Sequence, residues 1–132
     1  MEPGRIGIVT GEPALARDVE RQLPMFGLGA SKVVCLPAPG RTHLGSLQMF
    51  KDHWGTDAVV LLGAIDSAEE DACTDWIARH MDKPVVGFID PADPALPQQA
   101  RLRASGVRMS RDAAGIGELT ASLVELPWLP FD

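Results

Sequence analysis

The chain has 132 residues, enough for one domain that buries a core without disulfide or metal staples. Its net charge of −6 at pH 7 repels phosphate backbones and anionic lipid, so we expect neither a nucleic acid nor a membrane as partner. The 45% hydrophobic and 23% charged content is that of a globular protein and argues against a disordered tail or a long coiled coil.

Short apolar runs alternate with amphipathic stretches along the whole chain, which is the pattern of βαβ units. Four of the runs are rich in Val, Ile and Leu without alternation, as strands buried on both faces of a parallel sheet are. A fifth run is short. The expected strands are 5–9, 32–36, 58–63, 84–89 and 107–109.

Apolar residues recur at helical spacing between these runs. In the first such stretch they are Leu15, Val19, Leu23 and Phe26. Pro24 should kink this helix near its end, and Gly27 or Gly29 should close it. The other expected helices are 44–53, 68–81, 98–104 and 115–125.

Two local patterns place boundaries more closely. Ser67 followed three residues later by Glu70 is the pattern of a capping box, in which a hydroxyl and a carboxylate satisfy free backbone donors at a helix start. The segment 90–97 carries three prolines, so we expect a loop after the fourth strand.

Together these elements predict one α/β domain over residues 1–132, a three-layer α/β/α arrangement of flavodoxin-like type with a five-stranded parallel sheet. In such folds the loops that follow the strands meet at one edge of the sheet, where ligands bind. Here that edge should consist of segments 10–13, 37–43, 64–67 and 90–97.

That edge lacks the motifs of common cofactor sites. A flavin phosphate needs a glycine- and hydroxyl-rich loop after the first strand, but 10–13 reads Thr-Gly-Glu-Pro, with a carboxylate in the anion's place. The acidic pair and the aspartate of a phosphoacceptor receiver domain are missing, as are a dinucleotide fingerprint and a P-loop. We therefore expect no cofactor.

Cysteines and histidines are too few and too scattered for a metal centre, and we expect none. Cys35 and Cys73 fall in a predicted strand and on the apolar face of a predicted helix, where cysteine acts as a small buried hydrophobe. Both suit a reducing compartment. Without a signal-peptide pattern or an apolar run of about 18 residues, the sequence indicates a cytoplasmic protein.

A weak candidate for anion binding remains in the segment before the second helix. Arg41, Thr42 and His43 supply a guanidinium, a hydroxyl and an imidazole at a helix start, whose free N–H groups favour negative charge, and Ser67 offers a donor at another start. The plainer alternative is that Arg41 and His43 are solvated, that Thr42 is only an N-cap and that Ser67 only closes its box.

The tryptophans have two interpretations as well. For Trp54 and Trp76 we favour packing in or around the core over a role as stacking platforms. The C-terminal stretch carries Trp128, Leu129 and Phe131 between prolines, so it must either fold back over the domain or present an apolar interface to another chain.

Several runs resemble the C-terminal CoA-ligase domain of succinyl-CoA synthetase α subunits and their acyl-CoA synthetase relatives. In that family a strand ending in Gly-Glu-Ile-Gly-Gly precedes Ser-Ala-Glu-Glu and then Lys-Pro-Val-Val-Gly. The matching runs here are Ala-Val-Val-Leu-Leu-Gly-Ala-Ile at 58–65, Ser-Ala-Glu-Glu-Asp-Ala at 67–72 and Lys-Pro-Val-Val-Gly-Phe-Ile at 83–89. The resemblance extends more loosely over nearly the whole chain.

The resemblance also implies chemistry that this sequence lacks. In the family, a histidine in the loop after the fourth strand carries phosphate, and a glutamate after the third strand steadies it. Here Ala64 stands after the third strand, and the loop 90–97 is shorter than the family's and has no histidine. The family's serine- and threonine-rich loop after the first strand is replaced by Gly-Glu-Pro-Ala at 11–14, and its CoA-binding domain is absent.

We therefore predict a pseudoenzyme: a non-catalytic CoA-ligase-like domain that acts as a protein-interaction or subunit-type module, with a protein partner or self-association. A first alternative is an accessory subunit of an acyl-CoA ligase or of an acyl- or carbamoyl-transfer complex whose other domains lie on separate chains. A second alternative is a domain that binds a small anion such as phosphate.

Overall fold

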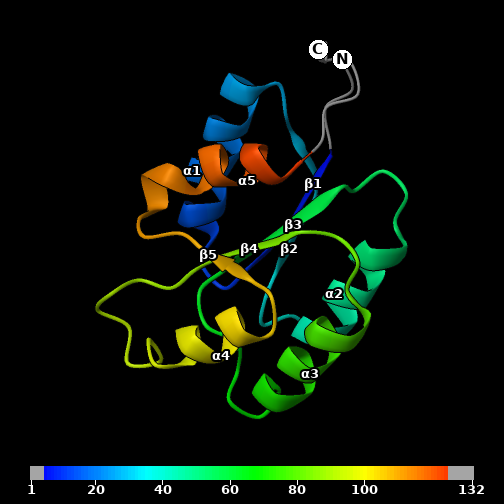
Figure 1. Cartoon of the computed structure of the whole chain (residues 1–132), viewed down its shortest axis with the longest axis vertical. Helices are drawn as coiled ribbons and strands as arrows, with labels where there is room; N and C mark the ends of the chain where they lie inside the picture. The colour runs from blue at the N-terminus through cyan, green and yellow to red at the C-terminus, as the bar shows by residue number, and fades with distance from the viewer. Residues whose placement is uncertain (1–4, 125–132) are drawn as a thin grey trace.

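A computed structural model describes residues 5–124 of the chain. Five parallel strands form one sheet in the order β2-β1-β3-β4-β5, which confirms the predicted flavodoxin-like α/β fold (Figure 1). The strands are β1 (Ile6–Thr10), β2 (Ala30–Cys35), β3 (Ala58–Leu62), β4 (Val85–Phe88) and β5 (Arg108–Met109).

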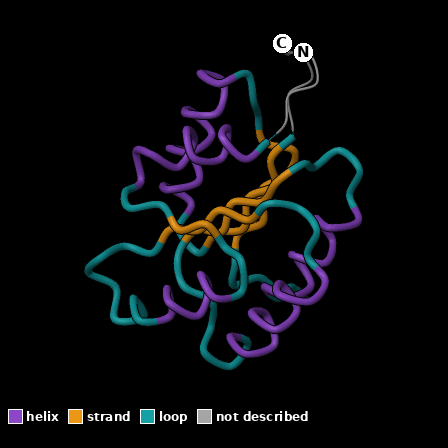
Figure 2. Tube along the Cα trace, in the orientation of Figure 1, coloured by secondary structure: helices purple, strands orange, loops and turns teal. Residues whose placement is uncertain are grey.

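Helices cover both faces of this sheet (Figure 2). One face packs against α1 (Pro13–Gln22), the 3-10 helix η1 (Leu23–Phe26), the 3-10 helix η2 (Ala113–Gly115) and α5 (Ile116–Leu123). The other packs against α2 (His43–Asp52), α3 (Glu70–His80) and α4 (Gln98–Ala104). Two buried apolar clusters, one on each side of the sheet, form the core. No helix of the described part, residues 5–124, is long and apolar enough to cross a membrane.

The expectation that the second strand is buried on both faces was wrong. β2 lies at the edge of the sheet and pairs only with β1. Of its six residues only Val34 is fully buried, and the thiol-bearing residue Cys35 is exposed. Cys73 is buried as predicted, because α3 turns it toward the sheet.

The end of the first helix follows the prediction. The α-helical part stops at Gln22, and Pro24 lies in η1, where a 3-10 turn replaces the α-helical geometry. Gly27 closes the segment with φ of 76°, a left-handed conformation that glycine adopts without strain.

The predicted capping box was wrong. The helix α3 begins at Glu70 itself, and its N-cap residue, Glu69, makes no side-chain cap. The carboxylate of Glu70 instead accepts hydrogen bonds from the Gln98 amide at 3.1 Å and from Arg101 at 2.8 Å. Gln98 and Arg101 on α4 thus bind the Glu70 carboxylate, which in a capping box would bind a backbone N–H at the helix start.

Helix α2 is fixed closely to the sheet. The ring of Phe50 fills the space beside Gly7 of β1, where a Cβ atom would lie only 2.5 Å from the ring. At the end of the helix, the Lys83 ammonium donates to the carbonyl oxygens of Phe50 at 2.7 Å and of His53 at 2.8 Å. These contacts set the position of α2, and so of the residues at its start.

The two tryptophans of the described region have different surroundings. Trp76 is half-buried against the core cluster beneath α3, as predicted. Trp54 is 93% exposed, so the expectation that it packs in or around the core was wrong. It lies in the turn between α2 and β3, beyond the reach of either cluster. The predicted interface residues Trp128, Leu129 and Phe131 lie outside the described residues.

Candidate functional site

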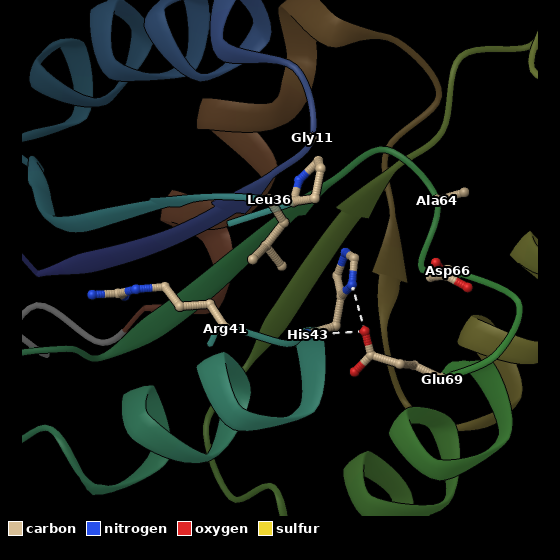
Figure 3. A pocket seen from close by; sticks show the side chains of 8 residues that line it. Gly11, Leu36, Arg41, His43, Ala64, Asp66 and Glu69 are labelled. Atoms are coloured by element: carbon tan, nitrogen blue, oxygen red, sulfur yellow. Dashed lines mark hydrogen bonds and ion pairs between the residues drawn. The ribbon is translucent and has the colours of Figure 1, made fainter. Parts of the chain in front are cut away.

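A cavity of about 420 Å³ opens at the carboxyl edge of the sheet, where the loops after β1, β2 and β3 meet (Figure 3). This place lies beside the first strand, where the strand order reverses, and it is the usual ligand position in open α/β sheets. The lining residues are Gly11, Leu36, Pro37, Arg41, His43, Ala64, Asp66 and Glu69.

The start of α2 forms one wall of the cavity. Thr42 is its N-cap: the hydroxyl accepts a hydrogen bond from the Gly45 N–H at 2.9 Å, and Ser46 donates to the Thr42 carbonyl at 2.7 Å. The Thr42 side chain therefore serves the helix, as the plainer alternative predicted. Capping leaves the N–H groups of the first two helical residues, His43 and Leu44, without a partner on α2.

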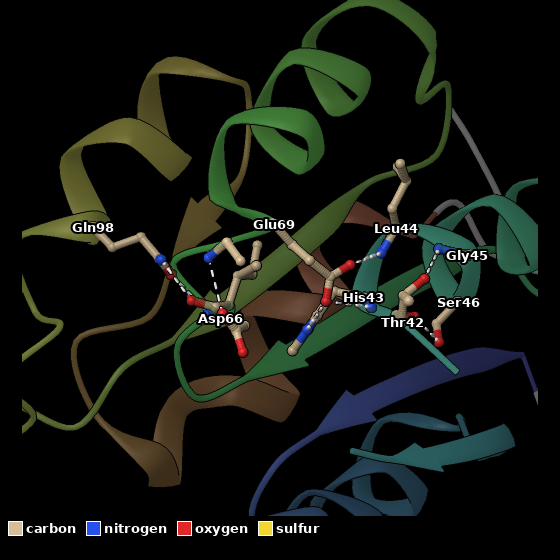
Figure 4. A network of polar contacts seen from close by, with 10 residues as sticks. Thr42, His43, Leu44, Gly45, Ser46, Asp66, Glu69 and Gln98 are labelled. Atoms are coloured by element: carbon tan, nitrogen blue, oxygen red, sulfur yellow. Dashed lines mark hydrogen bonds and ion pairs between the residues drawn. The ribbon is translucent and has the colours of Figure 1, made fainter. Parts of the chain in front are cut away.

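Glu69, from the start of α3, supplies that partner (Figure 4). Its carboxylate accepts hydrogen bonds from the N–H groups of His43 and Leu44, each at 3.3 Å. The same carboxylate lies 3.4 Å from Nδ1 of the His43 ring. One carboxylate thus joins the starts of two helices and contacts the imidazole of His43, which lines the cavity.

These contacts decide the charge of Glu69. Burial alone would raise the pKa of its carboxyl group, but the hydrogen bonds from Leu44 and His43, together with the nearby His43 ring, hold the pKa below its ordinary value. Glu69 is therefore ionised at neutral pH. A carboxylate at Nδ1 favours the tautomer with the proton on Nδ1, which leaves the Nε2 lone pair of neutral His43 facing the cavity.

The four residues predicted for anion binding do not all meet. Arg41 and His43 line the cavity, whereas Ser67 lines a separate hollow of about 500 Å³ beside α4. Asp66 falls in the predicted edge segment 64–67 but was not singled out, and Glu69 was missed as a lining residue. Parallel topology places all helix starts at this edge, a signal that identifies the region but not the pairing of Glu69 with His43.

A third hollow, of about 360 Å³, lies between the loop after β4 and the loop after β1. Glu12, Asp90 and Asp93 supply its charged lining, with no basic side chain or imidazole among its described residues. The Asp90 and Asp93 carboxylates each accept a hydrogen bond from a backbone N–H two residues on, at 2.8 and 2.7 Å, which fixes the turns of this loop. The hollow therefore repels phosphate.

Comparison with known proteins places the chain beside α subunits of CoA ligases. It is 35% identical over 89 residues to the α subunit of ADP-forming succinate–CoA ligase of Aquifex aeolicus. The matched segment covers 65% of this chain and 29% of the relative. To the α subunit of malate–CoA ligase of Methylorubrum extorquens it is 30% identical over 90 residues, 66% of this chain and 30% of the relative. No protein-family profile matches the chain.

Solved structures share the fold. An acetyl-coenzyme A synthetase of Candidatus Korarchaeum cryptofilum superposes with a TM-score of 0.77 at 15% identity, over 98% of this chain and 32% of that one. An ATP citrate lyase of Methanosaeta concilii gives a TM-score of 0.73 at 16% identity, over 92% of this chain and 24% of that one. In the curated relatives too, the chain spans only about 30% of their length.

Proposed function

We propose that this chain, which is homologous over two thirds of its length to part of the α subunits of succinate–CoA ligases, is a non-catalytic, subunit-type module that docks on other protein chains. The homology makes the fold and its carboxyl edge those of a CoA-ligase domain. What this edge lacks, on our proposal, is the chemistry that carries phosphate.

The acidic hollow beside the loop after β4 is the observation that carries the proposal. The family resemblance expects a phosphate-carrying histidine in this loop, and a carrier site needs a nucleophile, a positioning carboxylate and an anion cradle together. The charged lining consists of Glu12, Asp90 and Asp93, and Ala64 follows β3. These residues supply neither the imidazole nor the anion cradle that the family's carrier site has.

The partner follows from the relatives. Their names describe them as subunits, that is, as parts of assemblies of several chains. We infer that this chain likewise docks on another cytoplasmic protein chain or on a second copy of itself.

Native isolation tests this docking role. A chromosomally tagged chain should elute from size-exclusion chromatography of a cell extract at the mass of a complex, with one or a few stoichiometric companions identified by mass spectrometry. A chain that elutes as a monomer at its native concentration, before and after chemical cross-linking, would contradict the proposal.

Labelled nucleotide tests the absence of catalysis. The purified complex is incubated with a nucleoside triphosphate that carries a labelled γ-phosphate, and acid-labile phosphate on the chain is measured. We expect none. Acid-labile phosphate on His43, His53 or His80 would show that a histidine has taken over the role of carrier.

A second candidate function is that of an accessory subunit, which completes an acyl-CoA ligase or an acyl- or carbamoyl-transfer complex from separate chains. The naming of the relatives as subunits favours it. Here the test is reconstitution: the chain is mixed with a CoA-binding protein and an ATP-grasp subunit encoded beside it, and acyl-CoA formation is measured with and without the chain. Activity that needs the chain would support this candidate.

The C-terminal residues Trp128, Leu129 and Phe131 are the interface we propose from the sequence. Removal of residues 126–132 should lower the mass of the assembly in light scattering if they bind another chain. An unchanged mass would show that docking uses another surface.

A further inference from the structure

The start of α2 already holds an anion, and that anion belongs to the protein. The N–H groups of His43 and Leu44 lie at the positive end of a ten-residue helix, and Thr42 caps only the Gly45 N–H. The Glu69 carboxylate from α3 satisfies the two N–H groups at 3.3 Å each. These residues are 25 or 26 positions apart, so the contact is a tertiary one.

The cavity beside this contact offers further groups to an anion. His43 is only 8% exposed, and its Nε2 has no hydrogen-bond partner among residues 5–124. This nitrogen points away from Glu69 into the cavity, which Arg41 also lines (Figure 3). Its lone pair faces a cavity of about 420 Å³, where it can accept a hydrogen bond from a protonated oxygen of an anion such as hydrogen phosphate.

We propose that Glu69 is an internal blocking anion: it occupies the position at the start of α2 that an oxyanion of phosphate size would take, and such an anion binds in this cavity only when Glu69 leaves. The inference concerns ligand access and does not depend on the proposed docking role. It identifies an autoinhibitory contact in the cavity that Arg41 and His43 line.

Charge explains why the blocked cavity rejects anions. The carboxylates of Glu69 from α3 and Asp66 from the loop after β3 line the cavity beside His43, whereas the guanidinium of Arg41 points away from the ring (Figure 3). The lining next to His43 therefore carries negative charge, which repels an anion. Loss of Glu69 frees two N–H donors and removes the carboxylate that lies nearest to them, so the balance at the helix start turns positive.

Inorganic phosphate is the probe for this proposal. The full chain and its Glu69→Ala variant are titrated with phosphate by calorimetry and by amide NMR. The variant should bind at least about tenfold more tightly than the wild type, because the anion gains two backbone donors and loses a like charge. The amide signals of His43 and Leu44 should shift in the variant only.

Asp66→Asn is the matched control. It removes one negative charge from the same cavity, keeps the side-chain oxygen that accepts the Ala68 N–H at 2.9 Å, and leaves the α2 donors bound to Glu69. We expect no gain of phosphate binding. A gain equal to that of Glu69→Ala would mean that net charge alone controls access, and it would overturn the proposal.

Two further outcomes would overturn it. One is a folded Glu69→Ala variant that binds no phosphate. The other is a wild-type chain that binds phosphate as tightly as the variant, with its His43 and Leu44 amides shifting at the same phosphate concentrations. If Glu69→Ala does not fold, Glu69→Ser replaces it, since its hydroxyl carries no charge and lies two bonds nearer the backbone than the carboxylate oxygens. None of these results bears on whether the chain assembles with a partner, so the two proposals fail separately.

Discussion

Both ends of α2 are held by a charged side chain from elsewhere in the chain, but their surroundings differ. At the start, the Glu69 carboxylate accepts hydrogen bonds from His43 and Leu44. At the end, the Lys83 ammonium donates to the carbonyl oxygens of Phe50 and His53. Each side chain opposes the partial charge of the helix end that it meets.

The difference lies in what each pair borders. The Lys83 contacts lie at the amino edge of the sheet, where none of the three hollows described above is found, so they only fix the helix. The Glu69 contacts border the cavity of about 420 Å³ at the carboxyl edge. A charged side chain at a helix end thus stabilises the fold at one end of α2 and, on our proposal, blocks anion binding at the other.

The largest effect should come from the Phe50 ring, which packs α2 onto the sheet. Phe50→Ala removes a fully buried ring from beside Gly7 and should lower the free energy of unfolding by about 3–5 kcal/mol. Urea denaturation measures this loss. Leu44→Ala, which truncates a half-buried residue of the same helix, is the control and should cost clearly less; equal losses would mean that the Phe50 ring does not anchor α2.

A smaller loss should follow from Lys83→Met, which removes the ammonium at the helix end. Burial, the largest influence, lowers the pKa of Lys83, so desolvation offsets part of the gain from its two hydrogen bonds. We expect about 1 kcal/mol of destabilisation. Lys51→Met is matched to it, because Lys51 lies on α2 but reaches only Asp82, at 3.8 Å. Equal effects of the two changes would contradict the helix-end role of Lys83.

Glu69→Gln should cost about 0.5–1 kcal/mol at neutral pH, because its three contacts are long. The folded state holds the pKa of Glu69 below 4.5. Its contribution is therefore complete above pH 4.5 and is lost as the pH falls through the folded-state pKa.

Unfolding curves measured between pH 7 and pH 3 test this dependence. The stabilities of the wild type and of Glu69→Gln should converge toward the acid end. Thr74→Ala, which removes a hydroxyl and no ionisable group from the same helix, should keep a constant difference from the wild type. A wild-type advantage over Glu69→Gln that grows on acidification would refute the assignment.

The smallest effect concerns the thiols. Burial, with a contribution from the negative charge of Glu69, raises the pKa of Cys73 to about 12, whereas Cys35 is exposed. A disulfide reagent at pH 8 should therefore titrate one thiol in the native chain and two in denaturant. Two reactive thiols in the native chain would show that α3, which positions Glu69, opens readily.

The fold was predictable because each central strand is a continuous apolar run and each crossover helix shows its own period. The prediction failed where a neighbour in space decides the outcome. Cys35 belongs to an apolar run, but the run lies at the sheet edge, and strand order cannot be seen in the run itself. Glu70 fits a capping motif, but Arg101 and Gln98 bind it.

The candidate site was predictable in part for the same reason. Arg41 and His43 stood out because they precede a helix start at the expected ligand edge, and both line the cavity. Glu69 follows 26 residues later within what looked like a local helix-start pattern, and sequence spacing cannot show that its carboxylate crosses to another helix.

Because Phe50 of α2 packs directly on Gly7 of β1, substitutions at either position would move the start of α2 and the cavity beside it. A methyl group at residue 7 would overlap the phenyl ring, so the two positions can change only together: a larger residue on β1 calls for a smaller one on the helix. Any drift that breaks this match would lift α2 off the sheet and carry His43 away from Glu69. Gly7, the smallest kind of residue on β1, therefore keeps the His43 imidazole next to Glu69.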